Sequence, residues 1–139
     1  MLEPNLNHLI QQYKAAEYYV NHTLSFILRI DAVSAELQAL YHQHQIHSAA
    51  FITAWNPRSQ LLSLQANQQH QQVLQQALDT LGIAWLQGMG CNTEKTWQEE
   101  SLLALGIDKK NARELGERFE QNAIVWCGND AIPTLLMLS

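Results

Sequence analysis

Three short polar segments of this chain contain residue types that can bind a ligand or transfer a proton. Residues 53–59 follow an apolar run, residues 97–101 include two adjacent glutamates, and residues 119–123 include two neighbouring amides. Amides and hydroxyls donate and accept hydrogen bonds, and a carboxyl group can act as a general acid or base. This combination could recognise a small polar molecule.

The first segment contributes Thr53, Asn56 and Ser59 as candidate ligand-binding residues. They stand at the end of a predicted strand, and loops held by a rigid scaffold often carry binding residues. Asn56 also precedes Pro57, and an Asn-Pro pair starts turns in which the asparagine bonds its own backbone. A binding role and a structural role are both compatible with this pattern.

The second segment contributes Glu100 as the candidate catalytic residue, with Trp97 and Ser101 as candidate ligand-binding residues. Neighbouring side chains of an extended segment point to opposite sides, so at most one of Glu99 and Glu100 faces a given cleft. A buried glutamate with a raised pKa could act as an acid or base. Alternatively, the glutamate pair protects a strand edge and Trp97 fills the core rather than stacking on a ligand.

The third segment contributes Gln121 and Asn122, where a predicted helix passes into an apolar run. Their amides could cap the free carbonyl groups at the helix end. They could instead face a cleft and bind the donors and acceptors of a neutral ligand. The sequence leaves these two roles as alternatives.

Histidine and cysteine patterns predict no further site. Only His44 and His47 of residues 42–47 share a helix face, and no cysteine or carboxylate adjoins them, so we expect no metal site. Cys91 has no local motif that supplies a partner base. The glycine-rich phosphate loops and the zinc and serine-hydrolase motifs are missing from the sequence, so we expect no cofactor.

The composition is rich in amides and poor in charge. The 139 residues include 16 Gln and 9 Asn, whereas charged residues make up 15% and the net charge is −5. Scattered basic residues cannot neutralise a phosphate backbone, so we expect no nucleic-acid partner. Two cysteines, no secretory signal and no apolar run of membrane-spanning length favour a cytoplasmic protein without a membrane partner.

The hydrophobic pattern predicts one α+β domain over residues 1–139, a sandwich of about four helices and a mixed, largely antiparallel sheet. We expect helices over residues 4–15, from an N-cap at Ser34, from an N-cap at Ser63 to Gly82, and from an N-cap at Asp108 to about Glu120. Strands are expected at residues 18–20, 23–30, 49–55, 83–86, 100–105, 122–127 and 133–138, with a break at 88–90. If residues 134–138 form a sheet edge, they offer a route to a homodimer by strand pairing.

The polar segments resemble, in order and spacing, a bacterial family of uncharacterised proteins, domain of unknown function 3293. The resemblance covers the chain from about Tyr18 to Leu136. It implies a small single-domain protein with no established activity, cofactor or substrate, and it implies that the family's polar positions converge. Those positions are Thr53, Asn56, Pro57, Ser59, Asn67, Trp97, Glu100, Ser101, Gln121 and Asn122.

Two functions fit these observations. In the first, the amides and hydroxyls surround a small, largely neutral planar ligand, with Trp55 or Trp97 as a platform and Glu100 as the ionisable group. In the second, the chain is a non-enzymatic protein-interaction module whose polar residues only support loops and helix ends. The sequence leaves enzymatic activity open, and the two functions differ in whether these side chains share a cleft.

Overall fold

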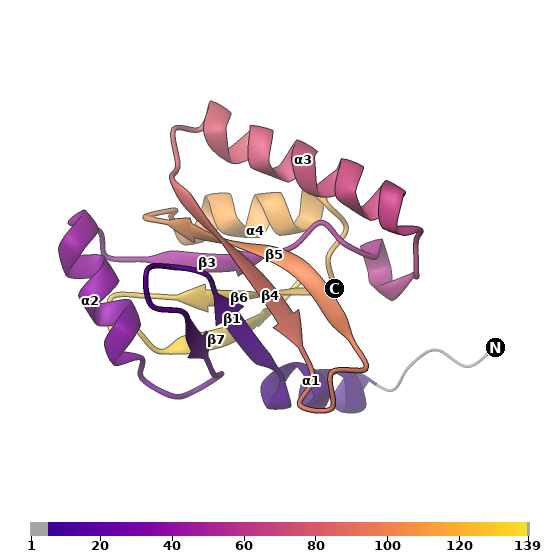
Figure 1. The fold of residues 1–139 in the computed structure, drawn as a ribbon, viewed down its shortest axis with the longest axis horizontal. Helices are drawn as coiled ribbons and strands as arrows, with labels where there is room; N and C mark the ends of the chain where they lie inside the picture. The colour runs from indigo at the N-terminus through magenta and orange to yellow at the C-terminus, as the bar shows by residue number, and fades with distance from the viewer. Residues whose placement is uncertain (1–5, 139) are drawn as a thin grey trace.

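The computed structural model describes residues 6–138, and within them seven strands form one sheet (Figure 1). The strand order is β2-β1-β4-β5-β3-β6-β7. All described pairings are antiparallel, so the expected α+β class is confirmed, but the parallel pairs of a mixed sheet are not found among these residues. The strands are β1 (Glu17–Val20), β2 (Phe26–Leu28), β3 (Ala49–Ile52), β4 (Trp85–Cys91), β5 (Gln98–Leu105), β6 (Ala123–Cys127) and β7 (Pro133–Met137).

Four α-helices begin close to the expected positions: α1 (Leu6–Ala15), α2 (Ala35–His44), α3 (Leu64–Thr80) and α4 (Lys109–Arg118). The three predicted N-caps are confirmed. Ser34, Ser63 and Asp108 each accept a hydrogen bond from the backbone N–H three residues later, at 3.1, 3.1 and 2.7 Å. Such caps stabilise a helix by about 1 kcal/mol each. Residues 4 and 5 of the first expected helix lie outside the described residues.

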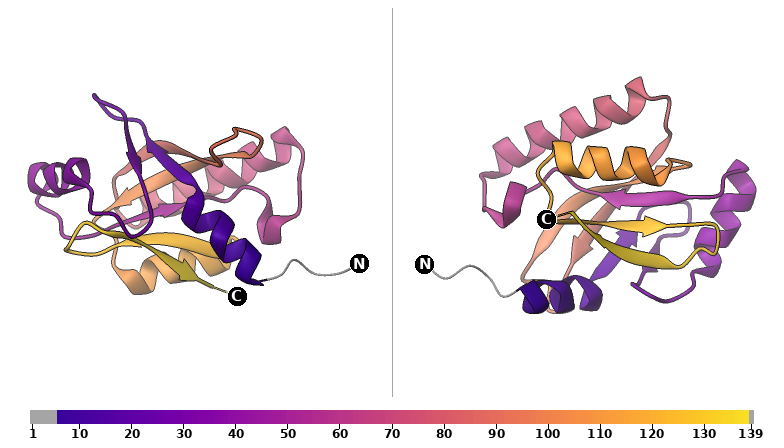
Figure 2. Two further views of the ribbon diagram at one scale, coloured as in Figure 1. Left: turned by 90° about the horizontal axis from the view of Figure 1, so that it is seen from below. Right: turned by 180° about the vertical axis from the view of Figure 1, so that it is seen from behind.

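The sheet carries a hydrophobic cluster on each face. Helices α3 and α4 cover one face, where Leu74, Leu78 and Leu115 pack against the sheet. Helix α2 and the β1–β2 hairpin cover the other, and in the view from below the hairpin and α4 lie on opposite sides (Figure 2). Successive side chains of a strand point to opposite faces. Since both faces of β3 are covered, Phe51 packs into one cluster and Ile52 into the other.

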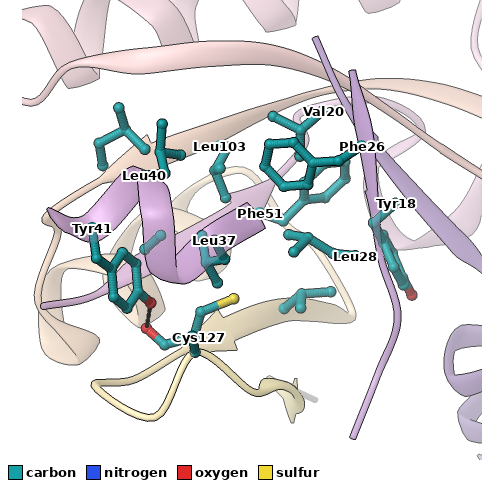
Figure 3. Packing of buried hydrophobic residues seen from close by; sticks show 14 of the residues in the cluster. Tyr18, Val20, Phe26, Leu28, Leu37, Leu40, Tyr41, Phe51, Leu103 and Cys127 are labelled. Atoms are coloured by element: carbon teal, nitrogen blue, oxygen red, sulfur yellow. Dashed lines mark hydrogen bonds between the residues drawn. The ribbon is translucent and has the colours of Figure 1, made fainter. Parts of the chain in front are cut away.

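The cluster under α2 is closed by aromatic side chains (Figure 3). The Tyr41 hydroxyl on α2 donates to the Cys127 carbonyl oxygen at 3.0 Å, which ties the helix to β6. The rings of Tyr18 and Phe51 meet edge to face with centroids 5.2 Å apart. This contact packs β1 against β3, although the two strands are not neighbours in the sheet.

The expected break at residues 88–90 is wrong, because β4 continues through both glycines to Cys91. Gly88 instead allows the backbone of Tyr19 and the ring of Phe51 to lie close to β4. A Cβ atom there would lie 2.6 Å from the Tyr19 carbonyl oxygen and 2.7 Å from the Phe51 ring. The expected strand 23–30 is also too long, since pairing is confined to β2 and Leu24 is 82% exposed.

Several segments distant in sequence meet at one end of the sheet. Helix α1 lies beside the turn that joins β4 to β5 (Figures 1 and 2). The short 3₁₀ helix η1 (Pro57–Ser59) follows the exit of β3, and the junction of α4 with β6 lies nearby. None of the helices in the described part of the chain is both long enough and apolar enough to cross a membrane.

Candidate functional site

A cavity of about 710 Å³ opens at this end of the sheet. Its walls are α1, residues 56–61, the β4–β5 turn and the α4–β6 junction. Five of the residues that the sequence singled out line it: Asn56, Ser59, Trp97, Gln121 and Asn122. Residues as far apart in the sequence as His8 and Asn122 therefore converge on one hollow.

A second cavity, of about 40 Å³, adjoins the first. The two share Tyr13, Trp97, Glu99 and Gln121 in their walls. Thr53 and Ser101, the sixth and seventh predicted residues, line only this inner recess. The Thr53 hydroxyl donates to the Glu100 carbonyl oxygen and accepts from the Trp55 N–H at 3.0 Å, so its hydrogen bonds support the β3 exit.

Asn56 is the centre of a buried hydrogen-bond network. Its backbone is left-handed, with φ 47°, a conformation that asparagine adopts more readily than most residues. Its side-chain oxygen accepts from the Leu62 N–H at 3.0 Å and from the Asn67 amide at 2.9 Å. Its side-chain nitrogen donates to Glu99 Oε2 at 2.9 Å. Asn56 thus combines the structural role with a position in the cavity wall.

Asn67 and Glu100 are not among the described residues that line either cavity. Asn67 is buried on α3 and accepts from the Asn56 N–H at 2.9 Å, so it supports Asn56 from behind. Glu100 follows Glu99 on β5, and successive side chains of a strand point to opposite faces. The geometry therefore favours Glu99 over Glu100 as the carboxyl group of the cavity.

Glu99 is the carboxyl group at the point where the two cavities meet. Burial raises its pKa to about 7, although hydrogen bonds from the Asn56 and Trp97 side chains favour the ionised form. The Ser101 hydroxyl donates to the Glu99 carbonyl oxygen at 3.0 Å and helps hold the strand. The two-residue period of a strand places Trp97, Glu99 and Ser101 on one face, and this signal in the sequence could have identified Glu99.

Tyr13 is a second residue that the sequence did not single out, because it continued the apolar stripe of the N-terminal helix. Burial raises the pKa of its phenol, and its hydroxyl hydrogen-bonds with the side chains of Asn122 and Ser59. The Asn122 amide also donates to the Ser59 hydroxyl at 2.8 Å. This cluster attaches α1 to the opposite wall of the cavity.

Gln121 performs the capping role that the sequence offered as an alternative, and it also lines the cavity. Its amide nitrogen donates to the carbonyl oxygens of Trp55 and Phe119, at 3.1 and 3.2 Å. Of the two tryptophans considered as a platform, Trp97 lines the cavity, whereas Trp55 is not among the described lining residues. The aromatic surface available to a ligand is therefore that of Trp97 and Tyr13.

The arrangement can bind hydrogen-bonding groups and exchange a proton. A carboxyl group with a pKa near 7 populates both protonation states at neutral pH, which is the condition for an efficient general acid or base. Within residues 6–138, no group of three or more His, Cys, Asp or Glu side chains is placed to hold a metal ion. Of the histidines considered for such a site, His44 and His47 are exposed.

Comparison with known proteins assigns a family but no activity. A family model described as "Protein of unknown function (DUF3293)" matches residues 52–124. No curated protein and no solved structure matches the chain. The matched region contains Asn56, Glu99 and Asn122, while Tyr13 lies outside it. Since the match covers more than half of the chain, the protein belongs to the DUF3293 family of proteins of unknown function.

Proposed function

We propose that this protein binds a small polar ligand in the cavity between α1, residues 56–61 and the β4–β5 turn. The observation that supports this most directly is Glu99, a partly buried carboxyl group at the cavity with a pKa of about 7. Burying a carboxyl group is unfavourable, and strongly perturbed groups in clefts cluster at functional sites. The volume of about 710 Å³ lies within the usual range for small-molecule sites.

The walls favour a planar molecule with hydrogen-bonding edges. Gln121 and Asn122 supply amides, Ser59 supplies a hydroxyl, and Trp97 supplies an aromatic surface. A ligand that displaces water from such a group without replacing its hydrogen bond would lose about 1–3 kcal/mol per group, so the site would discriminate by hydrogen bonding. If the ligand also carries a labile proton, Glu99 is the group positioned to exchange it.

Two adjacent glutamates provide a matched test. Thermal-shift screening of neutral and charged metabolites would use wild type, Glu99→Gln and Glu100→Gln. We expect a ligand that raises the Tm of wild type to lose its effect in Glu99→Gln and to keep it in Glu100→Gln. A ligand that stabilises all three proteins equally would show that binding does not depend on Glu99, and the reverse pattern would restore Glu100 as the site carboxyl group.

A second function, self-association as an interaction module, is favoured by the position of β7 at the sheet edge. The Leu138 N–H donates to the Asn122 carbonyl oxygen, and antiparallel pairs alternate. The N–H groups of Leu135 and Met137 therefore point away from β6. Such an edge can pair with a second copy of the chain.

Met137→Pro removes one outward N–H and leaves the bonds to β6 in place. We expect the elution volume of wild type in gel filtration to depend on concentration and that of the variant to be constant. A wild-type monomer at every concentration would contradict the dimer. For both functions we propose a reducing cytoplasm as the compartment, in which the buried Cys91 and Cys127 stay reduced.

A further inference from the structure

We infer that the ligand of this cavity is a small planar cation, such as an amidinium or an aromatic ammonium, bound by the Glu99 carboxylate beside the Trp97 ring. This inference rests on the proposed function and adds the chemical class of the ligand. It follows from the charges around the cavity, from the unused acceptor capacity of Glu99 and from the aromatic walls.

The charged groups around the cavity do not favour an anion. The ionisable side chains in its lining are His8, Glu94, Glu99 and the phenol of Tyr13, and none of the described lining residues is Lys or Arg. Two neighbouring basic residues, Arg58 and Lys95, contact other groups. Arg58 lies 3.7 Å from Glu120, and Lys95 contacts Glu17 at 3.3 Å. A phosphate or carboxylate ligand would therefore meet carboxylates without a strong cationic partner.

Glu99 has acceptor capacity left for a ligand. An ionised carboxylate offers about four lone-pair sites. Asn56 donates to Oε2 at 2.9 Å and the Trp97 side chain also donates to the carboxyl group. Both donors are neutral, so the negative charge is not compensated by the protein. A ligand N–H that carries positive charge would form a charge-assisted hydrogen bond there, which is about twice as strong as a neutral one.

The aromatic walls suit the same class of ligand. Trp97 and Tyr13 both line the cavity, and the faces of aromatic rings attract cations, most strongly in tryptophan. A planar cation could place its N–H groups on Glu99 and its flat face against a ring. A neutral planar ligand could also pack its flat face against a ring, but its N–H groups would form weaker hydrogen bonds with Glu99.

Binding of a cation should depend on pH. The pKa of Glu99 is about 7, so the ionised, binding-competent fraction rises about tenfold between about pH 6 and pH 8. The other titratable groups facing it are Tyr13 and Glu94 in the cavity wall and Tyr18 from β1, whose phenol has a pKa raised by burial. His8 on α1 also lines the cavity and therefore needs a control.

Three molecules of nearly the same shape test the inference: benzamidine, benzamide and benzoate, which are cationic, neutral and anionic. Chemical-shift titration of the labelled protein would give each Kd and show whether the Trp97 indole and its neighbours respond. We expect benzamidine to bind at least about tenfold more tightly than benzoate, with benzamide between them. The affinity for benzamidine should rise about tenfold from about pH 6 to pH 8.

Three variants separate the contribution of Glu99 to binding from those of Glu100 and His8. Glu99→Gln should abolish both the preference for benzamidine and its pH dependence, whereas Glu100→Gln and His8→Gln should retain them. If benzamide or benzoate shifts the cavity resonances with equal or lower Kd, the cationic class is wrong and the proposed pocket stands. If none of the three molecules shifts cavity resonances, both the inference and the proposed pocket fail.

Discussion

Two glutamates near the β4–β5 turn have pKa values shifted in opposite directions. Glu17 on β1 contacts Arg29 at 2.9 Å and Lys95 at 3.3 Å, and hydrogen bonds from Lys95 and Arg29 lower its pKa. Glu99 on β5 is partly buried among neutral partners, and desolvation raises its pKa to about 7. The partner and the access of water, rather than the residue type, decide the direction of the shift.

The surroundings of Glu17 and Glu99 also differ in whether they leave the carboxyl group available to a ligand. On the Glu17 side, the Lys95 ammonium donates to the Tyr19 hydroxyl at 2.7 Å and lies 3.3 Å from the Cys91 sulfur. Arg29 and Lys95 together more than compensate the negative charge of Glu17. On the Glu99 side, an amide and an indole orient the carboxyl group without neutralising it. The Glu17 carboxylate is already paired with cations, whereas an uncompensated carboxyl group beside a cavity is available to a ligand.

The largest expected effect comes from Asn56→Ala. The substitution removes the hydrogen bonds to Leu62, Asn67 and Glu99 and places alanine in a left-handed conformation. We expect a loss of about 2–4 kcal/mol in the free energy of unfolding, measured by urea denaturation. Lys95→Ala on the other cluster is the control and should cost much less, since exposed ion pairs contribute little. Equal losses would remove the energetic difference between the clusters.

The next effect is the pH dependence that Glu99 gives to stability. Its pKa is about 7 in the folded protein against an ordinary value of 4.5, so the folded state keeps a proton that the unfolded state releases. Stability therefore falls as the pH rises from about 4.5 to about 7, by on the order of 2–3 kcal/mol. Glu99→Gln should lack this fall when urea denaturation is compared at about pH 5 and about pH 8.

Glu17→Gln is the matched control for that pH profile. Because the pKa of Glu17 is lowered, its stabilising contribution is present above its unfolded pKa and is lost as the pH falls through the lower, folded value. The control should therefore preserve the slope between about pH 5 and pH 8. The same slope in wild type and Glu99→Gln would show that Glu99 is not the group responsible.

A smaller effect is expected from Tyr13→Phe, which removes the hydroxyl that bonds with Asn122 and Ser59. No residue of α1, all of which the structure describes, is fully buried, so the helix depends on such contacts. We expect the amides of α1 to lose about 1 kcal/mol of protection in hydrogen exchange. Tyr19→Phe in the Glu17 cluster should leave them unchanged. Unaltered protection in Tyr13→Phe would show that α1 is held by its apolar contacts alone.

The smallest effect on stability is expected for Lys95→Ala, but the change should be visible in thiol chemistry. Cys91 is buried beneath the Lys95 side chain, 3.3 Å from its nitrogen. We expect a maleimide or disulfide reagent to label Cys91 several-fold faster in the variant, because the thiol becomes accessible. Cys127 is an internal control, since it is 0% exposed. An unchanged labelling rate would mean that Lys95 does not shield the thiol.

The helices and most of the strands could be predicted because their signals are local. Ser34, Ser63 and Asp108 cap helices through atoms three residues away, and the apolar run of β3 is typical of a doubly covered strand. The predictions failed where a distant partner decided the local structure. Gly88 looked like a break, yet it is a strand residue whose missing side chain leaves room for Phe51 and Tyr19.

The candidate site also combines features that are local in the sequence with features that depend on distant partners. The residue types alone indicate its polar composition, its amides at element ends and at most one glutamate on each face of β5. That Glu99 lies at the cavity and that Tyr13 completes its wall became evident only from the folded chain. The physical reason is that convergence and desolvation depend on contacts between remote segments. The Asn56–Glu99 hydrogen bond joins residues 43 positions apart, and without the folded chain Glu99 would be an ordinary, solvated carboxylate.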